Sequence, residues 1–167
     1  MKRYIYQKKF YQFKVVYLGY FVVLIALYSV YRLLIGFSKL YVIVLLVCIY
    51  QIINTFISLS NPEEVDVDKD SISFKGFGKT HHYRFKDIQD FRVKEFVTAK
   101  KIYLRINKDS GSLLKGRYWI DCLYFSDGDE LFSYLLKKED EFHPDTIKAY
   151  AHRSNALTAE KNKKQEK

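Results

Sequence analysis

The chain has 167 residues, of which 49% are hydrophobic and 17% aromatic, and its formal net charge is +9 at pH 7. This length fits one ordinary domain, but the charge is unevenly distributed. Residues 1–60 hold seven basic and no acidic side chains, whereas residues 61–167 hold 21 basic and 19 acidic ones. Because the basic excess flanks apolar segments, it indicates contact with anionic lipid and argues against nucleic-acid binding.

Residues 1–12 form a basic, aromatic N-terminal segment. Tyrosines and phenylalanines lie in and just after this segment, and again around the link between the two apolar runs that follow. Aromatic side chains gather where a membrane meets water. We therefore expect one interfacial belt made of Tyr4, Tyr6, Tyr11 and Phe13, and a second made of Tyr28, Tyr31, Phe37 and Tyr41.

Two uncharged runs come next, 17 residues over Val15–Tyr31 and 23 residues over Leu40–Pro62. A helix needs roughly 20 apolar residues to cross a bilayer. These runs predict a transmembrane hairpin over residues 13–60, with helices at about 13–34 and 40–60. A cleaved signal peptide is disfavoured because bulky residues follow the first run. The alternatives are one span with a re-entrant segment, or a buried helical pair in a soluble protein.

Basic residues give the hairpin a direction. Five precede the first run, and the link over Arg32–Lys39 carries two. The positive-inside rule then puts both termini in the cytoplasm. Gln51 and Asn54 are the polar residues of the second span, and they are candidates for hydrogen bonds to the first helix or to another copy. Alternatively, they reach interfacial water near the helix end.

Beyond Pro62 the pattern changes to the alternation typical of strands, and residues 61–142 form a β-rich domain. Val65 and Val67, then Ile72 and Phe74, alternate with polar residues on either side of a turn. Further strands are expected over Thr80–Lys86, Phe91–Val97, Lys101–Ile106 and Arg117–Tyr124, with a loop over Asn107–Gly116. This spacing favours a small antiparallel sheet or a partly open barrel. The fold class is therefore an α+β membrane protein.

A helix is expected to close the sheet. Ser126–Glu130 supplies an N-cap and a capping-box acid, and one helical face carries Leu131, Phe132, Leu135 and Leu136. Residues 143–167 are expected to form a short helix from Asp145 to about His152 and a charged, disordered tail.

The order of strands, the Lys86–Gln89 step and the run Tyr83–Ile88 ahead of Phe91 and Val93 resemble a bacterial pleckstrin-homology-like (PH-like) domain. The chain is similar, over residues 13–142, to small bacterial membrane proteins in which two helices precede such a domain. A looser similarity is to the EbsA-type membrane proteins of Gram-positive bacteria. The resemblance implies a location in the bacterial plasma membrane and supplies no activity. Only about six strands are countable, where the full pattern has seven.

Three motifs suggest chemistry and fail on spacing. Gly76–Thr80 imitates a phosphate loop, but Ser73 stands where a glycine is required and a strand follows. Asp66–Asp70 imitates a calcium loop without its glycine and glutamate. His81 and His82 are adjacent on a strand, so their side chains point to opposite faces. Cys48 and Cys122 have no CxxC spacing, which argues against a zinc site or a disulfide. We expect no enzyme activity, metal, cofactor, nucleic acid or small-molecule substrate.

One basic cluster remains as a candidate contact for anionic head groups, which the PH-like resemblance supports; its residues are Lys75, Lys79, His82, Arg84 and Lys86. An ordinary solvated strand face is the alternative. Trp119 is either a peptide-binding aromatic or a core or membrane-proximal residue.

The sequence favours a membrane-tethered, non-enzymatic adaptor or regulator, with the bilayer and a protein partner or second copy as its contacts. Two alternatives are an anionic-lipid sensor that uses the basic cluster, and a subunit of an oligomeric pore or transport assembly.

Overall fold

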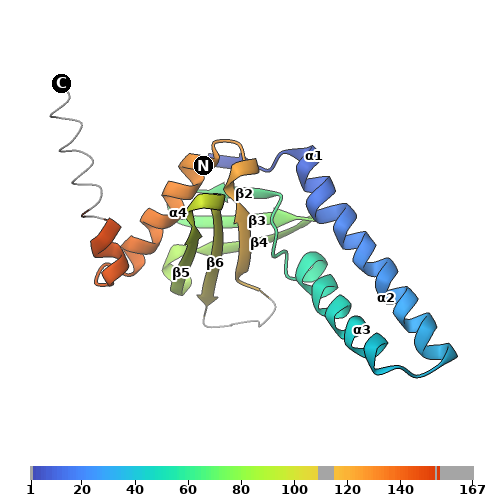
Figure 1. Ribbon diagram of the computed structural model, residues 1–167. Coiled ribbons are helices and arrows are strands. Elements are labelled where there is room, and N and C mark those ends of the chain that lie inside the picture. The colour runs from blue at the N-terminus through green and yellow to red at the C-terminus, as the bar shows by residue number, and fades with distance from the viewer. Residues whose placement is uncertain (1, 109–114, 153, 155–167) are drawn as a thin grey trace.

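The computed structural model describes residues 2–108, 115–152 and 154, and within them a helical hairpin stands beside a β-rich domain (Figure 1). The hairpin consists of two helical segments joined by a short link. Its elements are α1 (Lys8–Tyr11), a π-helical segment (Gln12–Tyr17), α2 (Leu18–Ile35), α3 (Lys39–Ile52) and a second π-helical segment (Ile53–Ile57).

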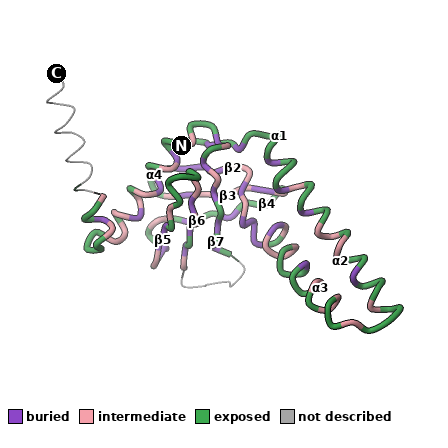
Figure 2. Tube along the Cα trace, in the orientation of Figure 1, coloured by how far each residue is buried: buried purple, intermediate pink, exposed green. Residues whose placement is uncertain are grey.

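In the described part of the chain, two helices are long and apolar enough to cross a membrane: Lys8–Ile35, with 28 residues, and Lys39–Ile57, with 19. Only 17% and 11% of their apolar windows are buried inside the molecule, and Figure 2 shows them largely exposed. Small buried residues such as Gly19 and Ala26 lie in α2, and a side chain added at Gly19 would meet the Phe56 ring. So much exposed apolar surface requires a cover outside the chain, such as a membrane.

The described strands form two antiparallel sheets. The first contains β1 (Lys2–Ile5), β2 (Glu64–Val67), β3 (Ser71–Gly76) and β4 (Lys79–Arg84), and the second β5 (Ile88–Phe96), β6 (Lys101–Lys108) and β7 (Arg117–Asp121). The predicted antiparallel pairing is confirmed. The sheets do not close into a barrel, because a 3₁₀ turn at Phe85–Asp87 ends β4 and separates it from β5. Of the predicted loop over Asn107–Gly116, residues 109–114 lie outside the described part.

β1 is a strand that the sequence did not predict. It pairs with β2 in antiparallel register, with Tyr4 opposite Val65 and Arg3 opposite Asp66. Tyr4 is 1% exposed and Tyr6 5%, so both belong to the core of the domain. The predicted interfacial placement is wrong for these two residues, and also for the buried Tyr11.

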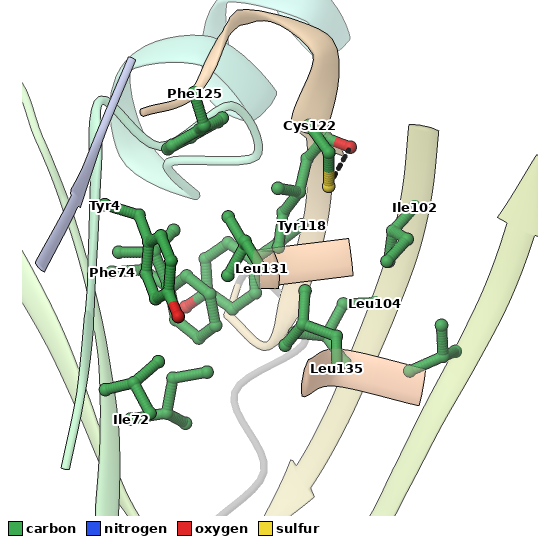
Figure 3. Close-up of a cluster of buried hydrophobic side chains, with 14 of the residues drawn as sticks. Tyr4, Ile72, Phe74, Ile102, Leu104, Tyr118, Cys122, Phe125, Leu131 and Leu135 are labelled. Carbon is green, nitrogen blue, oxygen red and sulfur yellow. Dashed lines mark hydrogen bonds between the residues drawn. The ribbon is translucent and has the colours of Figure 1, made fainter. Parts of the chain in front are cut away.

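The predicted apolar face of the closing helix is confirmed in α4 (Gly128–Phe142). Leu131 and Leu135 are fully buried, and Figure 3 shows Leu131 directed at Tyr4, Phe74 and Tyr118. These side chains come from α4 and from both sheets. The helix therefore holds the two sheets around one core.

The predicted capping box is wrong. Asp127 occupies the N-cap position of α4 and no side chain caps the helix. Ser126 contacts β1 instead: its hydroxyl accepts a hydrogen bond from the Ile5 N–H at 2.9 Å, and its own N–H donates to the Ile5 carbonyl at 2.9 Å. Glu130 pairs with Lys2 of β1. Ser126 and Glu130, which were expected to cap the helix, thus bind β1 to the start of α4.

A short helix follows α4 and protects the free edge of β5. Residues 147–152 are helical, within the predicted range. The Glu139 carboxylate accepts a hydrogen bond from the Val93 N–H at 2.8 Å, and Lys148 donates to the Val93 carbonyl at 2.8 Å while pairing with Glu139 at 2.6 Å. Charged side chains thus occupy an edge that would otherwise be open to another strand. The predicted disordered tail over 159–167 lies outside the described residues.

Candidate functional site at the base of the hairpin

The hairpin is inserted between two neighbouring strands, because β1 precedes it and β2 follows it. One backbone hydrogen bond joins the two crossing points, from the Tyr6 N–H to the Glu63 carbonyl at 2.8 Å. A second, from the Gln7 N–H to the Tyr124 carbonyl at 2.8 Å, joins the start of the hairpin to the turn that follows β7. The domain therefore holds the hairpin at two adjacent positions of one sheet.

Side chains reinforce this junction. The β3–β4 turn places the Phe77 ring 5.0 Å from the Phe56 ring, and Lys79 donates to the Phe56 carbonyl at 3.2 Å. On the other side, the Lys14 ammonium lies 3.8 Å from the centre of the Tyr124 ring and 3.5 Å from the Asp121 carboxylate. Contacts on both sides fix the direction in which the hairpin leaves the domain.

A pocket of about 360 Å³ opens between the domain end of α3 and the strands β6 and β7. The backbone N–H of Trp119 donates to the Ser60 carbonyl at 2.6 Å along the wall of the pocket. Its lining combines amides, hydroxyls and aromatic rings with one guanidinium, from Tyr50, Gln51, Ile53, Asn54, Thr55, Ser58, Ser60, Asn61, Tyr103, Arg117 and Trp119.

The pocket suits a polar or anionic group that lies beside an apolar helix. Arg117 is exposed and has no acidic partner in the described chain, and Trp119 is 37% exposed. Gln51 and Asn54 face this space, and within the described residues neither side chain hydrogen-bonds to α2. Their predicted interhelical contact stays a prediction. Tyr50, Tyr103 and Arg117 were missed by the sequence reasoning, although strand alternation at Tyr103 and Arg117 was available as a signal.

The structure does not gather the predicted basic cluster into one site. Lys75 pairs with the buried Asp66 at 2.5 Å, Lys79 is bound to the hairpin, and His82 hydrogen-bonds Ser73 at 2.7 Å. Arg84 pairs with Asp87 at 2.8 Å, and Lys86 is exposed. Arg84 and Lys86 line a separate open depression of about 400 Å³ at the end of β4 away from the hairpin. Head-group binding by this cluster stays a prediction.

A hydrogen-bonded chain of three side chains crosses the core. The His81 Nδ1 and the Tyr83 hydroxyl each lie 2.8 Å from the Tyr118 hydroxyl. Burial raises the pKa of Tyr118 and of Tyr83. Burial also lowers the pKa of His81, and the charges of Lys115 and Lys79 lower it further. The three groups are therefore neutral and serve to join the two sheets.

Acidic pH is expected to destabilise the protein through His81. The pKa of His81 is lower in the folded protein than in the unfolded chain, where it is about 6.5. As the pH falls below that value, His81 takes up a proton in the unfolded chain more readily than in the folded protein, so the free energy of unfolding decreases. Thermal unfolding of the full chain in detergent from pH 7 to pH 5 measures this loss. His81→Gln should flatten the profile, whereas His82→Gln on the exposed face should leave it unchanged. An unaltered profile in His81→Gln would contradict the prediction.

The remaining candidates for reactive chemistry are buried or dispersed. Burial raises the pKa of the Cys122 thiol to about 12, and Cys48 and Cys122 are both buried and unpaired with each other. In the described ranges, no three His, Cys, Asp or Glu side chains come together as metal ligands.

Comparison with known proteins identifies no relative: no protein-family model, no curated protein and no solved structure matches the chain.

Proposed function

We propose that the protein is a membrane-anchored, non-enzymatic adaptor or regulator of the bacterial plasma membrane. Its hairpin spans the bilayer twice, and both termini and the β-rich domain lie in the cytoplasm. The observation that carries this proposal is the insertion of an exposed apolar hairpin between two paired strands, β1 and β2.

Insertion at two points distinguishes this arrangement from a domain on a flexible tether. A single linker lets a domain rotate and present every face to the membrane. Here two adjacent chain crossings and the contacts of Phe77, Lys79 and Lys14 hold one orientation. Confinement at the bilayer raises the effective concentration of the domain for membrane partners, and a fixed orientation presents the same surface to each of them.

The strand count supports a PH-like domain. The sequence left the resemblance one strand short, and β1 supplies a seventh strand within the described residues. Four strands, three strands and a closing helix support that resemblance, whereas the position of the helices differs from it: they follow β1 and do not precede the whole domain.

A photo-reactive residue in α3 tests the adaptor role in intact cells. Leu46 and Val47 are 62% and 61% exposed, whereas Cys48 is 6% exposed. We expect irradiation to crosslink the chain at position 46 or 47 to one defined membrane protein or to a second copy. Position 48 is the matched control and should give no such product. A chain that remains uncrosslinked at every exposed position of α3 would refute the adaptor role.

A further inference from the structure

The outer surface of the second sheet carries five cations. Alternate residues of β6 point into the core, where Ile102 and Leu104 are fully buried, so the residues between them point outward. The strand register places Arg92, Arg105 and Arg117 opposite one another in one row across the sheet. Lys94 and Lys101 lie on the same surface. We call these five residues the basic face.

This arrangement is unfavourable for the fold alone, because like charges opposite each other on neighbouring strands destabilise a sheet. Arg92 pairs with Asp90 at 2.9 Å. Among the residues that the structure describes, the side-chain partner of Arg105 is the neutral Asn107, at 3.3 Å. Within the described ranges, Lys94 and Arg117 have no acidic partner. Lys101 stands opposite Asp121 in the register, and the Asp121 carboxylate already pairs with Lys14. The basic face therefore has an excess of positive charge that an anionic surface outside the chain would neutralise.

Aromatic rings lie among these cations. Trp119 stands opposite Tyr103 in the register, and the centres of their rings are 4.7 Å apart. The centre of the Phe96 ring lies 5.9 Å from the centre of the Trp119 ring. The Lys101 ammonium is 5.2 Å from the centre of the Trp119 ring. Exposed Trp and Tyr mixed with Lys and Arg are typical of surfaces that contact the head-group layer of a membrane.

The position of the hairpin identifies the anionic surface. Arg117 and Trp119 line the pocket against α3 beside Gln51 and Asn54, where the uncharged run of the helix becomes polar. Arg117 begins β7 and Arg105 lies three residues before the end of β6. In Figure 1 that end of β6 is on the side toward which the hairpin extends. The row of arginines thus adjoins the level at which α3 leaves the apolar layer.

We propose that the basic face binds the phosphate groups of anionic lipids in the bilayer that holds the hairpin. Guanidinium groups bind phosphate in a bidentate manner, and Trp119 and Tyr103 would insert between head groups. This inference rests on the proposed membrane anchoring and locates the lipid contact on β5–β7. The cations of the β3–β4 hairpin are less suited, because Lys75 and Arg84 are already paired with carboxylates.

Trp119 is the single tryptophan of the chain, so its fluorescence reports on this surface directly. The full chain is reconstituted into phosphatidylcholine vesicles and into vesicles that also contain phosphatidylglycerol. We expect phosphatidylglycerol to shift the Trp119 emission to shorter wavelength and to increase its quenching by brominated lipid. Both effects should decrease with added salt.

Charge reversal of the arginine row provides the decisive comparison. Arg92→Glu/Arg105→Glu/Arg117→Glu should abolish the response to phosphatidylglycerol, since each cation near the surface contributes about fivefold in affinity. The control variant, Lys69→Glu/Lys137→Glu, is compared with Arg105→Glu/Arg117→Glu; it makes the same change of net charge at exposed positions away from the face and should keep the response.

The outcomes separate the two proposals. A chain that fails to float with phosphatidylcholine vesicles would overturn the membrane anchoring itself. A chain that floats but gives the same Trp119 emission with and without phosphatidylglycerol would overturn only the lipid contact. A Trp119 response to polyglutamate or RNA that anionic vesicles do not reproduce would also overturn it. Equal loss in the two double variants would show a net-charge effect and refute a specific face.

Discussion

Replacing Tyr4 by alanine is expected to destabilise the β-rich domain by about 3–5 kcal/mol, although the residue precedes both apolar helices. The Tyr4 ring is 1% exposed and lies in the cluster of Figure 3 with Phe74 and Leu131. Its hydroxyl donates a hydrogen bond to the Glu130 carboxylate at 3.3 Å. Truncation leaves a cavity where β1 meets α4.

Thermal unfolding of the full chain in detergent measures this effect, and limited proteolysis of the domain checks it. Ile5→Ala is the matched control, because Ile5 belongs to the same strand and is 46% exposed; its cost should be less than about 1 kcal/mol. Equal and small losses in the two variants would show that β1 does not form part of the core.

Gly128→Ala is expected to cost about 3 kcal/mol, at the upper end for a substitution that overpacks a core. Gly128 is the first residue of α4, and a Cβ atom there would lie 1.8 Å from the Cys122 carbonyl oxygen. That oxygen belongs to the backbone and accepts a hydrogen bond from the Phe125 N–H. It cannot move without displacing the segment that pairs with β1.

The same substitution at Gly36 is the control, since no atom lies within 4 Å of the added Cβ there. Unfolding in detergent should show a lower midpoint for Gly128→Ala and an unchanged midpoint for Gly36→Ala. A Gly128→Ala protein as stable as the unmodified chain would mean that α4 does not begin against Cys122.

Periodicity predicted most of the fold. The long uncharged runs predicted the two apolar helices, and the alternation of Ile72 with Phe74 and of Ile102 with Leu104 predicted strands with one buried face. These signals are local, because each element's own residues determine which side is apolar. The same reasoning correctly placed Leu131 and Leu135 against the sheets.

The first strand escaped prediction for a physical reason. Tyr4 and Tyr6 alternate with Arg3 and Ile5 over too few residues to distinguish a strand from an interfacial segment, and a tyrosine suits both environments. Its partner, β2, lies about sixty residues away in the sequence. Only the tertiary pairing decides between the two interpretations.

The candidate site was predictable only in part. Lys75, Lys79 and Arg84 are close together in the sequence, which suggested one basic site. Their ion-pair and hydrogen-bond partners belong to other elements, such as Asp66 of β2 for Lys75, and these contacts were not predictable from the sequence. For Arg92, Arg105 and Arg117, by contrast, nothing in the sequence indicated that they form one site. These residues are far apart in sequence, and the register of three strands brings them together.

The placement of β1 ahead of the hairpin has a consequence for biosynthesis. The ribosome releases β1 first, and β1 finds its partner only after both apolar helices and residues 64–67 have emerged. During that interval, Tyr4 and Tyr6 have no core to enter. Assembly of the β-rich domain therefore follows synthesis of the hairpin and of β2, so that a chain interrupted within the hairpin leaves Tyr4 and Tyr6 exposed and open to quality-control proteases.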